Sequence, residues 1–278
     1  MSNETDTPQA SSAAAFYARA LRSLAEANVP HLVGGGYAFS HYTGVQRQAK
    51  DLDIFVHPHE VERALRVLAD LGCHTEMTFP HWLSKALYDG HLIDLIYSSG
   101  NGLAVVDEAW FTHATQVSVL GLPVQLIPVE EMIWSKAFIL ERERCDAADV
   151  LHLLRAAPQL DWDRLVRRFA GHYRVLYCYL ILFGYTYPSE RTLIPERVLE
   201  DFARRFAEEQ RRPDPSDSCQ GTLLSRSQFL VDIIHWGYAD RRLDPDVHMT
   251  REHIAQWTAA IPEGAGNHEG HNPHRSDV

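Results

Sequence analysis

The chain has 278 residues, of which 45% are hydrophobic and 23% are charged, and its formal net charge is −11 at pH 7. This composition is typical of a globular protein and excludes collagen-like, mucin-like and fully disordered chains. Because the charge is strongly negative, nonspecific binding to nucleic acid through bulk positive charge is not expected. The charge favours a cationic ligand, or an anionic ligand bridged by a metal ion.

The cysteines and the apolar segments indicate the cellular compartment. Cys73, Cys145, Cys178 and Cys219 form no C-x-x-C pair, so neither a zinc ribbon nor a disulfide framework is indicated. The N-terminal stretch lacks the basic start and apolar core of a signal peptide. The longest uncharged run, 175–189, is too short and too rich in tyrosine to cross a bilayer. We therefore expect a cytoplasmic protein with reduced thiols and no membrane partner.

The first half of the chain alternates between helical and strand patterns. Apolar periodicity predicts helices over 13–28 and 59–71, with another helix starting at Gly36. Short apolar runs predict strands over 31–33, 52–56, 83–88, 91–97, 116–120 and 124–127. Asp89-Gly90 is a favourable hairpin turn between two of these strands. We therefore predict an α/β domain over 14–128, with a small mixed sheet flanked by helices.

The second half is predicted to be mainly helical, as a separate domain over 129–260. Helical patterns cover 129–144, 147–155, 162–173, 198–212, 223–239 and 251–260, and the apolar run 175–189 is interpreted as a buried helix. Residues 1–13 and 261–278 are expected to be disordered. The C-terminal segment carries His268, His271 and His274, which are more typical of a solvated tail than of a metal site.

One stretch in the first half combines two features that are weak when taken singly. A short strand ends in Gly34 and Gly35 at the start of a helix, and a second strand then carries Asp51 and Asp53. Side chains two residues apart on a strand point to the same face, so these two carboxylates project together. They repel each other unless a cation lies between them, and Mg²⁺ is often held by one or two carboxylates plus substrate phosphates. The glycines let the backbone approach a phosphate near the start of a helix.

These residues resemble the nucleotidyltransferase superfamily with the polymerase-β-like fold. The superfamily pattern is an apolar residue, glycine, then glycine or serine, followed after a helix by Asp-x-Asp, and Val33-Gly34-Gly35 and Asp51-Leu52-Asp53 match it. Small bacterial members carry Arg-x-Thr-x-Asp-x-Asp, which 47–53 matches except that Ala49 replaces the threonine. The nearest resemblance is to aminoglycoside and lincosamide nucleotidyltransferases and to abortive-infection toxins. It implies that Gly34, Gly35 and Arg47 contact nucleotide phosphates.

The resemblance also implies a third carboxylate on a later strand. Asp94 is the natural candidate, because it is the only acid within the apolar run 91–97, where an unpaired charge would be costly. In the resembling families this residue is a metal ligand or the general base that takes the proton of the acceptor hydroxyl. The structural alternative is a strand-end carboxylate paired with an arginine.

A looser resemblance covers 126–154 in the helical half. In similar proteins a lysine on one helix contacts the nucleotide phosphates, and an acidic residue at the start of the next helix assists it. Here these would be Lys136 and either Asp146 or Asp149. The alternatives are that Asp146 caps the helix after it and that Lys136 is a solvated helix residue.

Taken together, the resemblance implies an enzyme that moves an NMP from an NTP, for example ATP, to an acceptor hydroxyl and releases pyrophosphate. Asp51, Asp53 and Asp94 would bind two Mg²⁺ or Mn²⁺ ions. The acceptor stays open among a small molecule, tRNA and a protein, and a toxin–antitoxin partner is possible. The rival functions are a non-catalytic, antitoxin-type binding module and, less favoured, a glycosyltransferase whose Asp-x-Asp binds a sugar nucleotide.

Overall fold

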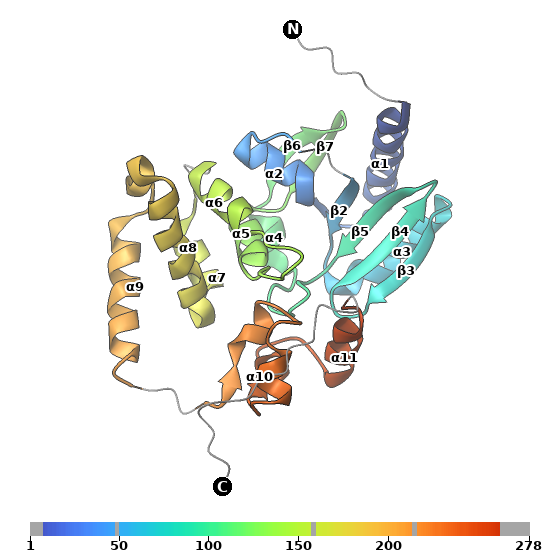
Figure 1. Cartoon of the computed structure of the whole chain (residues 1–278). Helices are drawn as coiled ribbons and strands as arrows, with labels where there is room; N and C mark the ends of the chain where they lie inside the picture. Colours follow the sequence, from blue (N-terminus) through green and yellow to red (C-terminus); the bar gives the residue numbers. More distant parts are fainter. Residues whose placement is uncertain (1–7, 48–49, 157–159, 213–215, 262–278) are drawn as a thin grey trace. The chain divides into compact units, whose positions relative to one another are not determined.

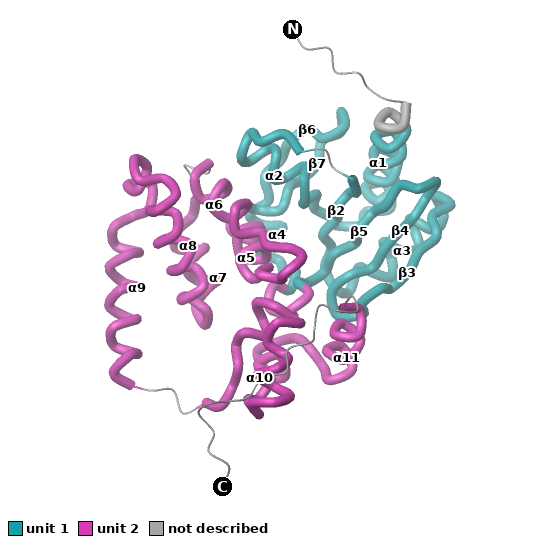
Figure 2. Tube along the Cα trace, viewed as in Figure 1, with its two compact units in different colours: residues 1–99, 105–128 teal, residues 100–104, 129–278 magenta. Residues whose placement is uncertain are grey.

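The structure is a computed structural model, which describes residues 8–47, 50–156, 160–212 and 216–261 (Figure 1). The chain divides into two compact units: residues 1–99 with 105–128, and residues 100–104 with 129–278 (Figure 2). Each unit is described on its own below. Within the described residues, no helix is both long enough and apolar enough to cross a membrane.

Unit 1 is built on a mixed sheet that has seven strands among the described residues. The strand order is β3-β4-β5-β2-β1-β7-β6. The bounds are β1 Leu32–Val33, β2 Asp51–Phe55, β3 His74–Phe79, β4 Leu83–Tyr88, β5 His91–Ile96, β6 Thr115–Val119 and β7 Leu122–Leu126 (Figure 1). Strand β2 pairs parallel with β5 and antiparallel with β1, which in turn pairs parallel with β7. The predicted α/β class with a small mixed sheet is therefore confirmed.

The helices of unit 1 are α1 Pro8–Glu26, α2 Gly35–Thr43, α3 Val61–Asp70 after a 3₁₀ turn Pro58–Glu60, and α4 Glu108–Thr112. Helix α1 packs on α3 and β5, and α3 packs on β3 and β4. The strands β2 and β5 contribute alternate residues to the buried core between the sheet and these helices, as expected for a sheet with one face packed on the core. Its strand residues include Leu52, Ile54, Ala86, Ile93 and Leu95, each with no exposed surface. The alternate residues of β2 and β5, among them Asp51, Asp53 and Asp94, therefore lie on the other face.

Unit 2 is mainly helical, as the sequence indicates. Its helices are α5 Val129–Ala137, α6 Ala147–Ala156, α7 Trp162–Arg168, α8 Tyr173–Thr186, α9 Glu196–Glu209, α10 Leu230–Ile234 and α11 Arg251–Ala259. Short 3₁₀ turns cover Ala170–His172, Pro188–Leu193, Gln220–Leu223 and Arg241–Leu243, and β8 Ser218–Cys219 pairs with β9 Ala239–Asp240. Helix α5 packs on α6 and α7, and α8 packs on α6 and α9.

Several predicted boundaries are corrected by the structure. Helix α1 begins at Pro8, so residues 8–13 are helical rather than disordered. The predicted helix 129–144 ends at Ala137, because the chain turns back and Asp146 N donates to Ile139 O at 3.0 Å. Within the predicted helix 223–239, the structure forms only the short helix α10. Gly237, whose φ is 74°, lies after the end of this helix. Residues 1–7 and the tail from 262, with its histidines, lie outside the described residues.

Candidate active site

The start of helix α2 and strand β2 together form the candidate site, entirely within unit 1. Strand β1 ends at Val33, Gly34 is the N-cap of α2, and Gly34 N donates to Asp53 O at 2.9 Å. This bond places the glycine turn directly beside the middle of β2. Gly34 also lies against the Phe55 ring, since a Cβ built on Gly34 would come 2.3 Å from that ring.

Gly35 is fixed by two independent features. Its φ is +52°, in the left-handed region that favours glycine. A Cβ built on Gly35 would also lie 1.6 Å from Asp53 Oδ2, so the Asp53 carboxylate occupies the space that a side chain would fill. The carboxylate therefore rests against the first turn of α2, where the helix dipole stabilises negative charge.

The two carboxylates of β2 are half-buried and project from the same face of the strand. The burial of β2 alternates, with Asp51 and Asp53 partly exposed and Leu52 and Ile54 fully buried between and after them. Asp94 lies on β5 as the register partner of Asp53. Neighbours in register on one face of a sheet are about 5 Å apart, so the structure brings all three predicted carboxylates onto one face.

Asp94 is not unpaired in that row. Lys85 on β4 is its register partner on the other side, and Lys85 Nζ donates to Asp94 Oδ1 at 2.9 Å. The sequence left open that Asp94 is paired with an arginine. In the structure its partner is a lysine, Lys85. The sequence carries the signal for this pair, because a two-residue turn at Asp89-Gly90 that pairs Tyr88 with His91 also pairs Lys85 with Asp94.

A buried phenol that the sequence analysis did not single out lies beside the site. Tyr17 of α1 is 2% exposed, and its hydroxyl donates to Lys50 O at 3.4 Å, immediately before Asp51. Burial, together with the nearby Tyr37 and Asp51, raises the pKa of Tyr17 to about 12. The phenol therefore stays protonated and remains a hydrogen-bond donor at any physiological pH.

Arg47 lies on the chain between α2 and β2. Its guanidinium stacks over the Phe39 ring at 4.0 Å from the centroid, and its backbone N donates to Ser40 Oγ at 3.4 Å. Both contacts tie Arg47 to α2. Residues 48–49, including the Ala49 that departs from the family pattern, lie outside the described residues.

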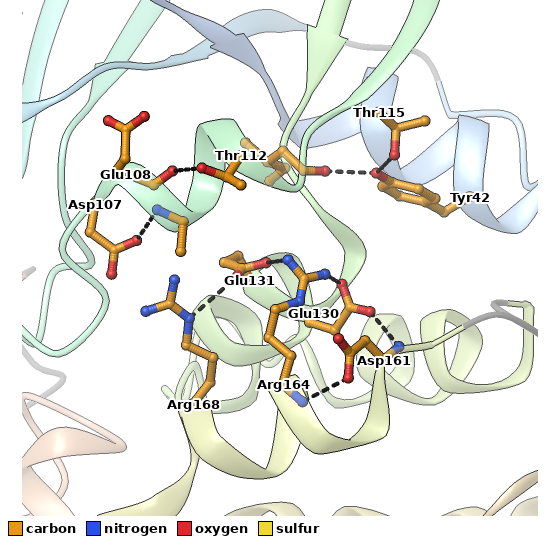
Figure 3. Close-up of polar contacts among 12 residues, drawn as sticks. Tyr42, Asp107, Glu108, Thr112, Thr115, Glu130, Glu131, Asp161, Arg164 and Arg168 are labelled. Atoms are coloured by element: carbon orange, nitrogen blue, oxygen red, sulfur yellow. Dashed lines mark hydrogen bonds and ion pairs between the residues drawn. The ribbon is translucent and has the colours of Figure 1, made fainter.

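The position of α2 is set by Tyr42 near its C-terminal end. Tyr42 OH donates to Ile127 O at 2.8 Å and lies 3.2 Å from Thr115 Oγ1, as Figure 3 shows for Thr115. This helix is thereby attached to β6 and to the chain just after β7. The glycine turn at the opposite end of α2 is held in place by the same anchor.

The donor chemistry fits a divalent cation at Asp51 and Asp53. Both are oxygen ligands on one face, and Gly35 lets the Asp53 carboxylate lie against the start of α2. Across the described residues, no group of three His, Cys, Asp or Glu side chains is arranged to hold a metal ion. A two-carboxylate site completed by substrate phosphates is the arrangement that this donor set supports, with Asp94 set apart by its lysine partner.

Lys136, the predicted phosphate contact, lies in unit 2. Its Nζ donates to Asp146 Oδ2 at 2.6 Å and to Asp149 Oδ2 at 2.9 Å, and its side chain is 15% exposed. It is therefore not a solvated helix residue. Burial works to raise the pKa of Asp146, but bonds from Arg144 and the charge of Lys136 hold that pKa below its usual range.

A second buried charge cluster in unit 2 connects α5 to α7. Arg164 pairs with Glu130 and, at 3.3 Å, with Glu131, and Arg168 Nε donates to Glu131 Oε1 at 3.0 Å (Figure 3). Glu130 also accepts from Asp161 N at 2.7 Å, at the N-cap of α7. Since every acid in this cluster is matched by an arginine or a backbone donor, we interpret it as a structural link.

The comparisons with known proteins identify the family of the chain. The sequence model of a family described as "Uncharacterised nucleotidyltransferase" matches residues 4–183. The match spans both the Gly-Gly and Asp-x-Asp motifs and the Lys136 helix. The chain therefore belongs to this nucleotidyltransferase family and is a nucleotidyl-transferring enzyme. No curated protein matches the chain.

Solved structures with similar folds were also found. ANT(2")-Ia, in complex with adenylyl-2"-tobramycin, is 17% identical, with 59% of this chain and 98% of that chain covered and a TM-score of 0.44. The lincosamide antibiotic adenylyltransferase LnuA, lincomycin-bound, is 17% identical, with 50% of this chain and 94% of that chain covered and a TM-score of 0.37. An antigenic nucleotidyltransferase-like protein from Paracoccidioides brasiliensis is 14% identical, with 65% of this chain and 91% of that chain covered and a TM-score of 0.43.

Proposed function

We propose that this enzyme transfers an NMP from an NTP to an acceptor hydroxyl by a reaction that depends on Mg²⁺ or Mn²⁺ held by Asp51 and Asp53. The observation that carries the proposal is the position of the Asp53 carboxylate against Gly35, with Asp51 on the same face of β2. When bound there, the cation would neutralise the triphosphate and stabilise charge on the leaving pyrophosphate.

The chain's own residues have separate tasks in this reaction. The Gly34-Gly35 turn lets phosphate oxygens approach backbone N–H groups at the start of α2. Arg47, attached to α2 through Phe39, supplies positive charge to the phosphates. Asp94 accepts the proton of the acceptor hydroxyl, whose oxygen forms the new bond to the α-phosphorus while the bond to the pyrophosphate oxygen breaks.

We propose the class of acceptor from the net charge of the chain. The chain carries a net charge of −11, which favours a small cationic molecule over tRNA. tRNA and a protein are the other acceptors that the labelling assay can return, and a toxin–antitoxin partner is a separate possibility. Lys136 is proposed, from the looser resemblance alone, as a further phosphate contact, and Asp146 and Asp149 hold its ammonium group.

The test is transfer of radiolabel from NTPs to pooled acceptors: aminoglycosides, tRNA and total protein. Label at the α-phosphate should reach one pool with Mg²⁺ and not with EDTA, whereas label at the γ-phosphate should appear in pyrophosphate. Asp53→Asn should lower the rate by at least ~10²-fold. Nucleotide binding without transfer to any pool would contradict the proposal and favour the binding-module alternative.

A further inference from the structure

The face of the unit 1 sheet that carries Asp53 and Asp94 holds a row of charged residues across four strands. In register, the row runs from Asp53 on β2 to Asp94 on β5, Lys85 on β4 and Glu76 on β3. Residues in register share a face and are close neighbours. The row therefore extends from the proposed site along the sheet. Lys85 contributes the positive charge among these four residues.

The ammonium group of Lys85 is directed at the carboxylate nearest the site. Lys85 Nζ bonds Asp94 Oδ1 at 2.9 Å, and the two side chains are 32% and 17% exposed. Leu92 and Ile96 flank Asp94 on the same face of β5, which makes an unpaired charge there costly. The pair is thus less screened by water than an ordinary surface ion pair.

The charge balance of the site indicates what the pair does. Near the proposed metal site, Asp51, Asp53 and Asp94 contribute three negative charges and Lys85 one positive charge, which leaves −2. Glu76, on the far side of Lys85, adds a further negative charge at the end of the row. One divalent cation compensates the −2 of the three aspartates and Lys85. Without Lys85 those aspartates would carry −3, and Asp94 would be available to a metal ion beside Asp53.

We infer that Lys85 is a positioning residue that holds Asp94 by one carboxylate oxygen and reserves its other oxygen for the acceptor hydroxyl rather than for a metal ion. The inference rests on the proposed function, since it assigns the division of labour among the same three carboxylates. It departs from the expectation that all three ligate metal. The ammonium group takes the place of a second cation at Asp94.

The test measures Mn²⁺ binding to the metal-free full-length protein by electron paramagnetic resonance, and separately the kinetics of nucleotidyl transfer. The wild type should bind one Mn²⁺ without nucleotide. Lys85→Met and Lys85→Gln should bind Mn²⁺ about tenfold more tightly, because one positive charge near the ion is gone. Lys85→Arg should resemble the wild type. In kinetics, Lys85→Met should lower kcat about tenfold or more, with NTP affinity changed less than threefold.

Arg63→Met is the matched control, because Arg63 pairs with Glu60 elsewhere in unit 1 and its loss changes net charge equally. It should leave Mn²⁺ affinity within twofold of the wild type. Unchanged or weaker Mn²⁺ binding in both folded Lys85 variants, with wild-type binding that depends on Asp51 and Asp53, would overturn the role of Lys85 alone. No Mn²⁺ binding to the wild type, with or without NTP, would overturn the proposed function and this inference together.

Discussion

The Asp53 carboxylate occupies the space beside Gly35 in which any other residue would place its Cβ. A Cβ built on Gly35 would lie 1.6 Å from Asp53 Oδ2 and 2.5 Å from its carboxyl carbon. The glycine motif and the aspartate motif are thus not two separate signals. The glycine is required because the carboxylate must rest against the helix start, and each residue fixes the position of the other.

This relationship predicts strong coupling between the two positions. Gly35→Ala should destabilise the protein by more than the ~1–3 kcal/mol expected for a strained left-handed residue, because the methyl group also displaces the carboxylate. In an Asp53→Ala background the clash with the carboxylate is absent and only the 3.0 Å contact with the Cβ of residue 53 is left, so the same change should cost less. Urea unfolding of the four proteins gives the coupling free energy, and additive effects would contradict the close approach. Gly121→Ala is a control, with φ of 74° and no atom near its Cβ.

Tyr17 should act on the site through the backbone rather than by touching substrate. Tyr17→Phe removes the bond to Lys50 O and should cost about 0.5–1.5 kcal/mol of stability. It should also weaken metal-dependent nucleotide binding several-fold, because the segment leading into Asp51 loses an anchor. Tyr97→Phe removes a comparable buried phenol that donates to Phe79 O at 2.9 Å. Equal nucleotide affinity in both variants would show that Tyr17 is purely structural.

Lys136 should be essential for the stability of unit 2. Lys136→Met leaves Asp146 and Asp149 buried without their shared cation, which should cost about 3–5 kcal/mol. Replacing all three residues, with Asn at both acidic positions, should recover much of that loss. Thermal unfolding tests this prediction. If Lys136→Met had the same melting temperature as the wild type, the ammonium group would contribute nothing to the stability of the fold.

The same cluster predicts an acid dependence with a defined sign. The pKa of Asp146 lies below its ordinary value of 3.8 in the folded protein, so the ionised form is favoured on folding. Its stabilising contribution is complete above about pH 4 and is lost as the pH falls through the folded pKa. Asp146→Asn should therefore flatten the stability–pH curve below pH 4. A curve with the wild-type slope in that range would contradict the contribution of Asp146.

The sequence predicts the part of the site that local patterning determines. The alternation in β2 indicates that Asp51 and Asp53 share a face, and the glycines after β1 mark the helix start. The two-residue hairpin turn determines the Lys85–Asp94 register as well, although only a reading of both strands together reveals it. These features depend on neighbours along the chain or across one tight turn.

The missed features depend on contacts between distant segments. Strand β3 has no buried residue and lacks an apolar alternation, so its strand conformation depends on pairing with β4. Tyr17 reaches Lys50 across 33 residues, and no local pattern distinguishes it from other core residues of α1. Helix α5 ends at Ala137 rather than continuing because the following turn brings Asp146 to Lys136, a tertiary contact that overrides helical propensity.

In the proposed reaction, Asp51 and Asp53 together hold the cation that brings the nucleotide to the Gly35 turn. Isothermal calorimetry of ATP binding with Mg²⁺ and with EDTA tests it most directly, in the wild type and in Asp51→Asn/Asp53→Asn. The matched control is Glu62→Gln/Asp70→Asn, which removes two exposed carboxylates of α3 in the same unit. We expect Mg²⁺-dependent ATP binding in the wild type and the control, and its loss in the Asp51/Asp53 variant. Mg²⁺-dependent binding of equal strength in all three folded proteins would contradict it.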